Sequence, residues 1–269
     1  MNDFEIYNEM EDDVQAIYRS RLLTEILLSL NDTSKKLSQL REITGSTSQA
    51  VIPKLRKLEE DHLIEAKGRE YYLTPVGKIV ASGVADSFAT VGTINKFKYF
   101  WSTHYLEGIP NPLLKEIGYL YNSKILRDRR TKILSAYSNQ LKMIKEANHM
   151  YGISSVITEG YADSISEKVK EGIPVELIVP LHVAEELKQS LYIEKLEILK
   201  NYSNFKLKFM NEAIKMGLIV TDKCLALSLY KKRGTEYDIS TGLFSPDPKA
   251  IEWGERLFEY CNIHSETCF

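Results

Sequence analysis

The sequence predicts an α/β protein with two domains. Between residues 16 and 74, helical spacing of apolar residues gives way to two short β-rich runs, which indicates a small helical domain with a hairpin. From residue 151 onward, short β-rich runs alternate with amphipathic helices, which predicts a C-terminal α/β domain with a mostly parallel sheet. The 269 residues suffice for two such cores. We expect domains at 1–78 and 151–269, joined by a helical connector at 79–150.

The composition excludes several classes of protein. Apolar residues make up 43% and charged residues 27%, as in soluble globular proteins. The net charge is −2, so a basic surface for nucleic acid must be local. The longest apolar runs are far too short to span a membrane, and the acidic first fifteen residues lack the apolar segment of a secretory signal. These features predict a cytoplasmic protein with no membrane partner.

The three cysteines, Cys224, Cys261 and Cys268, are odd in number and lie in the last quarter of the chain. This pattern is not a disulfide framework, which also favours a reducing cytoplasm. Pairing of Cys261 with Cys268, or a metal site that includes His264, is the minor alternative, because no second pair of ligands is visible. We therefore expect neither a metal site nor a cofactor.

The N-terminal third predicts three helices followed by a hairpin. The first helix ends at a break around Asn31, and Ser34 stands where an N-cap belongs ahead of the second. After a turn at Gly45, a third helix is expected over about 48–61, with its apolar residues on one face. The runs LIEA and EYYL then predict two strands, joined by a basic tip at 67–69.

This order of elements is the plan of a winged helix-turn-helix domain, which binds double-stranded DNA. Free N–H groups and hydroxyls at the start of the third helix suit a phosphate, and an amide or guanidinium side chain on that helix suits a base edge. Basic side chains at the hairpin tip suit the adjacent backbone. The expected DNA contacts are Ser46, Thr47, Ser48, Gln49, Arg56, Lys57, Lys67 and Arg69.

Two observations weigh against a simple version of this interpretation. A helix with one apolar and one charged face is usually only a solvated surface helix, so the third helix alone would be weak evidence. In addition, Pro53 lacks a backbone donor and crowds the carbonyl four residues earlier, at Gln49. The helix must therefore start late or have an irregular first turn, which leaves the identity of the base-reading residues open.

After the hairpin, Thr74 and Pro75 predict the start of a long helix, or of two helices, that is rich in small residues early and aromatic late. The aromatic residues Phe97, Tyr99, Phe100 and Trp101 suit a dimer interface and burial within the same chain equally well. The runs LLKEIGYLYNSKI and, at 131–150, TKILSAYSNQLKMIKEANHM also predict helices.

In the C-terminal region, GISSVIT, VELIVP and FKLKFM predict strands, separated by helices in YADSISEKVKEG and in the segment 183–202. The run MGLIVTDKCLALSLY predicts a hairpin that turns at Asp222 and Lys223. The run SPDPKAIEWGERLFEYC predicts a closing amphipathic helix.

The joint FWSTHYLEGIP and the ending AIEWGERLFEYC, together with VELIVP and GLIVTDKCLALSLY, resemble one family across nearly the whole chain. It comprises archaeal winged-helix transcriptional regulators with a methanogenesis-regulator-type effector domain. The resemblance implies a phospholipase-D-like effector domain without catalysis, usually in a dimer. Active phospholipase-D enzymes use His-x-Lys followed four residues later by Asp, and none of the five histidines here has Lys two positions later. That departure argues against an active enzyme of this type.

In open α/β sheets, ligands bind beyond the carboxyl ends of the strands. Those ends offer Glu159, Tyr161 and His182, which are our candidates for contacting an effector. A catalytic constellation of Glu159, His182 and Glu212 is the alternative, but no nucleophile and base have a suitable spacing.

The sequence therefore predicts a dimeric DNA-binding transcriptional regulator with no catalytic residues and with a small-molecule effector left open. A nucleic-acid-processing enzyme that is targeted by the winged helix remains an alternative. So does a scaffold that joins other proteins through the aromatic helix.

Overall fold

The computed structural model describes residues 2–128, 134–188 and 192–268. The chain divides into two compact units, the first ending at Phe88 and the second beginning at Ala89. The helices predicted at 131–150 and 183–202 include residues 131–133 and 189–191, which lie outside the described residues, as do the terminal residues 1 and 269 of the predicted domains.

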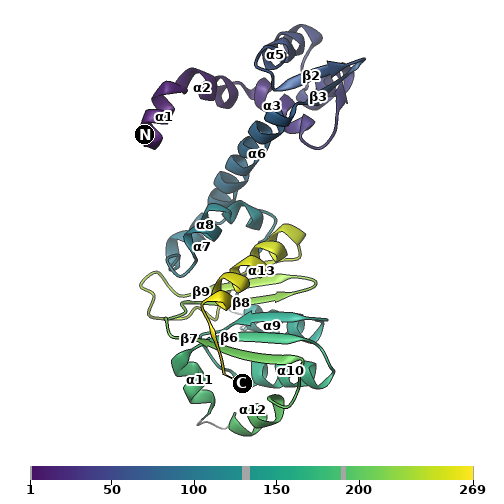
Figure 1. Ribbon diagram of the computed structural model, residues 1–269. Coiled ribbons are helices and arrows are strands. Elements are labelled where there is room, and N and C mark those ends of the chain that lie inside the picture. The colour runs from purple at the N-terminus through teal and green to yellow at the C-terminus, as the bar shows by residue number, and fades with distance from the viewer. Residues whose placement is uncertain (1, 129–133, 189–191, 269) are drawn as a thin grey trace. The chain divides into compact units, whose positions relative to one another are not determined.

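The first unit contains mainly helices and a small sheet (Figure 1). Its elements are α1 (Asp3–Glu9), α2 (Glu11–Arg19), α3 (Arg21–Leu30), β1 (Lys35–Lys36), α4 (Leu37–Thr44), α5 (Ser48–Glu60), β2 (Ile64–Lys67), β3 (Glu70–Leu73) and the start of α6 (Pro75–Lys96). The three strands are ordered β1-β3-β2, and all the pairs are antiparallel. The core combines apolar side chains of α3, α4 and α5, namely Ile26, Leu27, Leu40, Val51, Leu55 and Leu58.

The three helices and the hairpin thus occur in the predicted order. The prediction that Ser34 caps the second helix was wrong, because the Ser34 hydroxyl donates instead to Glu70 Oε2 at 2.9 Å, across to the hairpin. The residues after it form the short strand β1, and α4 begins after Lys36. Pro53 lies inside α5, which begins at Ser48.

The second unit contains an α/β fold. Its helical elements are α7 (Lys98–Thr103), α8 (Asn111–Lys115), the 3-10 helix η1 (Ile117–Leu120), α9 (Ser135–Lys145), α10 (Glu159–Lys170), α11 (Leu181–Leu187), α12 (Ile193–Leu199) and α13 (Pro248–Ile263). Its strands are β4 (Lys124–Arg127), β5 (Met150–Ile153), β6 (Val175–Pro180), β7 (Phe205–Met210), β8 (Met216–Thr221), β9 (Leu225–Leu229), β10 (Thr241–Ser245) and β11 (Glu266–Thr267).

Among the described residues these strands form one eight-stranded sheet, ordered β11-β7-β6-β5-β8-β9-β10-β4. The prediction of a mostly parallel sheet was wrong. Strand β6 runs parallel to both β5 and β7, and the remaining described pairs of strands in this sheet are antiparallel. The βαβ crossovers set the first three directions, whereas the β8–β9 hairpin, which turns where predicted, pairs antiparallel with β5 and extends the sheet.

The segment 79–150 is not a separate connector in this division, because much of it is part of the second unit. Phe97, Phe100 and Trp101 are buried in the same hydrophobic cluster as strands β8 and β9, so these three aromatic residues fill a core of their own chain. Tyr99, the fourth aromatic residue of this segment, is exposed. The run predicted as helical after residue 112 ends in a strand, β4, which pairs with β10 at the edge of the sheet.

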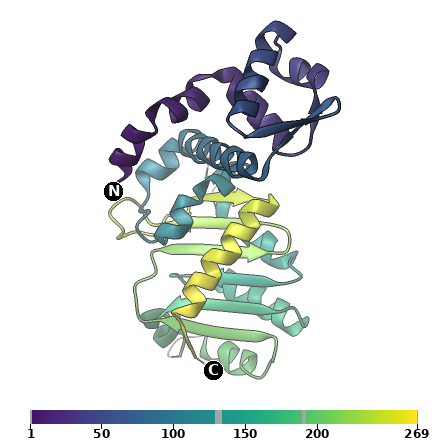
Figure 2. The same ribbon diagram turned by 45° about the horizontal axis from the view of Figure 1, so that its top comes forward.

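Helices cover both faces of this sheet, and side chains along the strands alternate between two cores. On β8, Leu218 and Val220 belong to the core beneath α13, while Ile219 belongs to the core beneath α9–α12. Figure 2 shows α13 crossing the strands on its face of the sheet. Trp253 of α13 is fully buried and donates its indole N–H to the carbonyl of Leu113 at 2.9 Å.

A buried side-chain hydrogen bond joins the end of α7 to the loop between β9 and β10. His104 Nε2 lies 3.2 Å from Asp238 Oδ2, and its Nδ1 lies 2.7 Å from the Phe100 carbonyl. Burial opposes ionisation of Asp238, but hydrogen bonds from His104 and Ser240 outweigh it and hold the pKa of this carboxyl below its usual value. The pair therefore fixes the loop that carries Tyr237 against the helix.

None of the helices formed by the described residues is both long enough and apolar enough to cross a membrane.

The end of α5 yields a prediction about stability. His62 adopts a positive φ of 58°, and the Leu63 N–H reaches back to the Leu58 carbonyl at 2.9 Å, as in a helix stop that normally carries glycine. His62→Gly should raise the free energy of unfolding of the first unit by about 1 kcal/mol, because it removes the left-handed strain of a residue with a Cβ. Amide hydrogen exchange of α5 in the full chain measures this. His62→Ala keeps the Cβ and should give no gain, and a glycine variant with faster exchange would contradict the assignment.

The buried pair yields a second prediction. Asp238→Asn should lower the free energy of unfolding of the second unit at neutral pH by about 1.5–3 kcal/mol, the range for hydrogen bonds to charged groups. Because the folded-state pKa of Asp238 is depressed, the stabilisation is full above about pH 4, the unfolded-state value. It is lost as the pH falls towards the folded-state value.

Denaturant unfolding followed by tryptophan fluorescence reports on the second unit, because both tryptophans, Trp101 and Trp253, lie there. The control is Glu236→Gln, which removes an exposed pair with Lys231 and should change stability by less than about 1 kcal/mol. Equal stability of wild type and Asp238→Asn at neutral pH would refute a stabilising role for the pair.

Candidate functional site

The first candidate site combines the outer surface of α5 with the tip of the β2–β3 hairpin, and α5 leads into strand β2 and contacts it (Figure 1). Val51, Leu55 and Leu58 hold α5 on the core. The helical period then turns Gln49, Arg56 and Lys57 away from the core, and all three are exposed. Lys67 and Arg69, at the hairpin tip, are exposed as well.

The basic side chains of this surface differ in their partners. Lys57 pairs with Asp61 at 2.8 Å, and Lys67 pairs with Glu65 at 2.5 Å. The hydrogen bond from Lys67 to Glu65 raises the pKa of this lysine. In contrast, Arg56 and Arg69 form no ion pair with any residue that the structure describes. The two arginines therefore remain available for an external anion.

The hydroxyl groups at the start of α5 differ in whether they already form hydrogen bonds within the protein. Thr47 is the N-cap residue but makes no capping hydrogen bond through its side chain. The Ser46 hydroxyl donates to the Thr44 carbonyl at 3.2 Å, within the turn. Thr47 and Gln49 are exposed, and Ser46 and Ser48 are half-buried. The free N–H groups of the first turn remain the main donors at this end.

A shallow groove runs between the start of α4 and the hairpin, with Lys36 and Ser38 on one side and Arg69 on the other. Sequence reasoning missed Lys36, because β1 was not predicted and this residue was assigned to a helix. The basic doublet Lys35-Lys36 was the available signal, and in the structure it pairs with Tyr71 and Glu70 of the hairpin.

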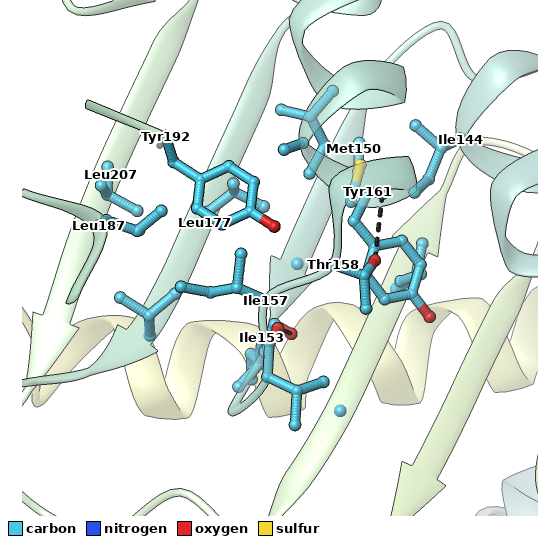
Figure 3. Close-up of a pocket in the computed structure, with 18 of the residues that line it drawn as sticks. Ile144, Met150, Ile153, Ile157, Thr158, Tyr161, Leu177, Leu187, Tyr192 and Leu207 are labelled. Carbon is cyan, nitrogen blue, oxygen red and sulfur yellow. Dashed lines mark hydrogen bonds between the residues drawn. The ribbon is translucent and has the colours of Figure 1, made fainter. Parts of the chain in front are cut away.

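The second candidate site is a cavity of about 110 Å³ within the second unit, between the sheet and helices α9, α10 and α12. Figure 3 shows Tyr161 and Tyr192 on opposite sides of it, with Ile153 and Ile157 along one wall. Most of its lining is aliphatic, and Met150, Leu177 and Leu207 form the wall on the sheet side.

The polar groups of the cavity form a short chain of hydrogen bonds. The Tyr161 hydroxyl donates to Gln140 Oε1, and Gln140 Nε2 donates to Ser228 Oγ at 2.9 Å. Thr158 Oγ1 caps α10 by accepting the Tyr161 N–H, and it lies 2.9 Å from the Tyr137 hydroxyl. Burial raises the pKa of the Tyr161 hydroxyl, so this group is neutral at neutral pH.

Of the three residues predicted to contact an effector, only Tyr161 lines this cavity. Glu159 and His182 are exposed and lie outside its lining. Glu212, the third member of the alternative catalytic constellation, is exposed too. In the described part of the chain, no hydrogen bond or ion pair joins any two of Glu159, His182 and Glu212.

Gln140 is a cavity residue that sequence reasoning missed. It lies on α9, three and four residues before the buried Met143 and Ile144, so it shares their inward face. A polar residue on the apolar face of a helix was the signal that could have found it.

The cysteines form no site among the described residues. All three are free thiols, and no group of three potential metal ligands occurs in that part of the chain. Burial raises the pKa of the Cys261 thiol to about 12, which makes this thiol unreactive.

Comparison with known proteins identifies relatives of both units. Residues 11–91 match the family described as "Methanogenesis regulatory protein FilR1, N-terminal domain", and residues 133–262 match "Methanogenesis regulatory protein FilR1, middle domain". A curated relative, the methanogenesis regulatory protein FilR1 of Methanothrix harundinacea (strain 6Ac), is 24% identical over 255 residues. The match covers 94% of this chain but only 57% of that relative.

Two solved structures are more distant. TrmBL2, described as an archaeal chromatin protein with a novel mode of DNA binding, is 14% identical, with a TM-score of 0.42 over 96% of this chain and 99% of its own. The phospholipase D family member Nuc from Salmonella typhimurium is 13% identical, with a TM-score of 0.41 over 54% of this chain and 96% of its own.

The two matched segments together span more than half of the chain and come from one family. The chain therefore belongs to the FilR1 family of methanogenesis regulatory proteins.

Proposed function

We propose that this chain is a DNA-binding transcriptional regulator. Its first unit is a winged helix-turn-helix domain that contacts double-stranded DNA, and its second unit senses a small-molecule effector without catalysing a reaction. The observation that carries the proposal is the pair of exposed arginines, Arg56 on α5 and Arg69 at the hairpin tip, which are unpaired among the described residues.

The chemistry of this surface suits a nucleic acid. Guanidinium groups bind phosphate, and the N7 and O6 atoms of guanine, through two hydrogen bonds at once. The N-terminus of α5 offers free N–H groups to a phosphate, with the hydroxyls of Ser46, Thr47 and Ser48 close by. Gln49 is exposed on the first turn and presents an amide that can bind a base edge.

The lysines contribute differently from the arginines in this proposal. Lys57 and Lys67 must give up their pairs with Asp61 and Glu65 before they bind phosphate. Exposed ion pairs contribute little to stability, so breaking these pairs costs little. A lysine that gives up a pair nevertheless gains less free energy from binding phosphate than an unpaired cation would. We therefore assign the larger part of the phosphate affinity to Arg56 and Arg69.

We further propose that the regulator is a homodimer. On α6, Val76 and Ile79 are 57% and 75% exposed, although both are large aliphatic residues one helical turn apart. A second copy of the helix would cover such residues, as expected for a regulator that reads two half-sites.

The sensing role rests on the cavity of the second unit, which combines an apolar lining with a few fixed polar groups, as binding sites for small molecules do. An effector can act only if it binds one conformation of the protein more tightly than another. The resulting change in the free energy of DNA binding cannot exceed the difference between the effector's binding free energies for the two conformations.

The DNA surface predicts the behaviour of two matched double variants. Arg56→Ala/Arg69→Ala should weaken binding to an operator in the protein's own upstream DNA. It should also reduce the slope of log affinity against log salt by about two units, because each lost phosphate contact removes about one. The matched variant Lys57→Ala/Lys67→Ala should weaken binding less, because both of its lysines start from ion pairs.

Fluorescence anisotropy at several salt concentrations measures both variants against wild type and random DNA. An arginine variant with unchanged affinity and slope would contradict the assignment of this surface. Wild-type binding no tighter to any genomic DNA than to random DNA would favour the scaffold or the enzyme instead.

A further inference from the structure

We propose that the cavity of the second unit binds a small, uncharged and mainly apolar molecule, about the size of one six-membered ring, that carries a single hydroxyl group. The inference rests on the proposed sensing function, because it names the class of ligand that the sensor takes.

The size of the cavity sets the size of the ligand. Its volume is about 110 Å³. An engineered protein cavity of roughly 150 Å³, lined by aliphatic and aromatic side chains, stays dry and binds benzene. A cavity on this scale encloses one ring or a short branched chain, and it is too small to enclose a nucleotide, a sugar with several rings or a long acyl chain.

The lining sets the polarity. Ile144, Ile165 and Leu196 from three helices face Leu177 and Leu207 of the sheet across the cavity. Water in such a space would lack hydrogen-bond partners over most of its surroundings, so displacing it by an apolar molecule is favourable.

The charges near the cavity disfavour an ionised ligand. Lys195 is the only residue of the described lining that carries a full charge at neutral pH. Its ammonium group already binds Asp163, and that hydrogen bond raises the pKa of the lysine, so the pair is neutral as a whole. A carboxylate ligand would have to displace Asp163 from this lysine, and an ammonium ligand would meet no carboxylate in the described lining, so a neutral ligand is favoured.

The hydrogen-bond chain at one end of the cavity specifies the hydroxyl group. Because Tyr161 uses its proton to bind Gln140, whose Nε2 in turn donates one hydrogen bond to Ser228, the Tyr161 oxygen is left as an acceptor. The buried Gln140 side chain, 7% exposed, is held at both ends and fixes this polarity. A ligand that donates one O–H group satisfies the Tyr161 oxygen, whereas a purely apolar ligand leaves it unpaired.

The same end is closed by Tyr237, which also lines the cavity. Its hydroxyl lies close to the β8 backbone at Gly217, where an added Cβ would be only 2.3 Å from that oxygen. Glycine at this position thus makes room for a second tyrosine hydroxyl. Burial raises the pKa of the Tyr237 hydroxyl to about 12, so the hydroxyl groups of Tyr161 and Tyr237 are both uncharged at neutral pH.

The test is a ligand-observed NMR titration of the full chain, without DNA, with p-cresol, toluene and benzoate. These probes share a ring and differ in the group attached to it. We expect p-cresol to bind most tightly, toluene more weakly, and benzoate at least about tenfold more weakly than p-cresol. No binding of p-cresol or toluene, or benzoate binding as tight as that of p-cresol, would overturn the proposal.

Two variants locate the binding. Tyr161→Phe should weaken p-cresol binding about two- to tenfold, the range for one hydrogen bond, and leave toluene binding within about twofold of wild type. The matched control Tyr260→Phe, on α13 and partly exposed, should change neither. Equal affinity of wild type and Tyr161→Phe for p-cresol would overturn the assigned orientation.

Ala162→Leu places three more carbon atoms in the cavity from α10 and should abolish the binding of both neutral probes. Tryptophan fluorescence checks that the variant is folded. If it is not folded, the comparison of p-cresol binding by wild type and Tyr161→Phe tests the location of the site instead. Because no DNA is present, failure of these titrations overturns the ligand class alone, whereas the anisotropy measurement tests the regulator itself.

Discussion

The second unit depends on one constraint: both faces of its sheet must be covered. The central strand β8 is buried along its whole length, and its side chains alternate between two cores. Such a strand is stable only if helices close both faces, because exposed apolar residues on either side would cost about 25 cal/mol per Å². The helix α13 closes one face, and α9–α12 close the other.

The two faces are closed to different degrees. On the first, Gly254 lets α13 approach so closely that an added Cβ would lie 2.3 Å from Leu225. On the second, α9, α10 and α12 meet the sheet around Tyr161 and leave a cavity. A close-packed interior resists change, whereas a face with a cavity can bind a ligand without prior rearrangement. The same sheet thus provides a close-packed support on one side and a cavity on the other, as our proposal of a sensor requires.

Local patterns in the sequence predicted local structure well, and long-range pairing poorly. The helix over 48–61 was recovered almost to the residue, because its apolar residues have one clear period and its ends carry clear signals. The strand β4 was read as helix, since its pairing with β10 joins segments more than a hundred residues apart. Of the residues expected to contact an effector, Tyr161 lines the cavity, whereas Glu159 is exposed. Two residues along a helix turn a side chain by about 200°, so neighbours in the first turn of α10 cannot share a face.

The central claim is that the first unit selects particular DNA sequences. The most direct measurement is a selection of genomic fragments bound by the full chain at physiological salt, followed by footprinting of the enriched fragments. Our account predicts one enriched motif with two protected half-sites, whose centres lie about one helical turn, or a multiple of it, apart. Enrichment that follows only base composition or fragment length, with no common motif, would contradict it.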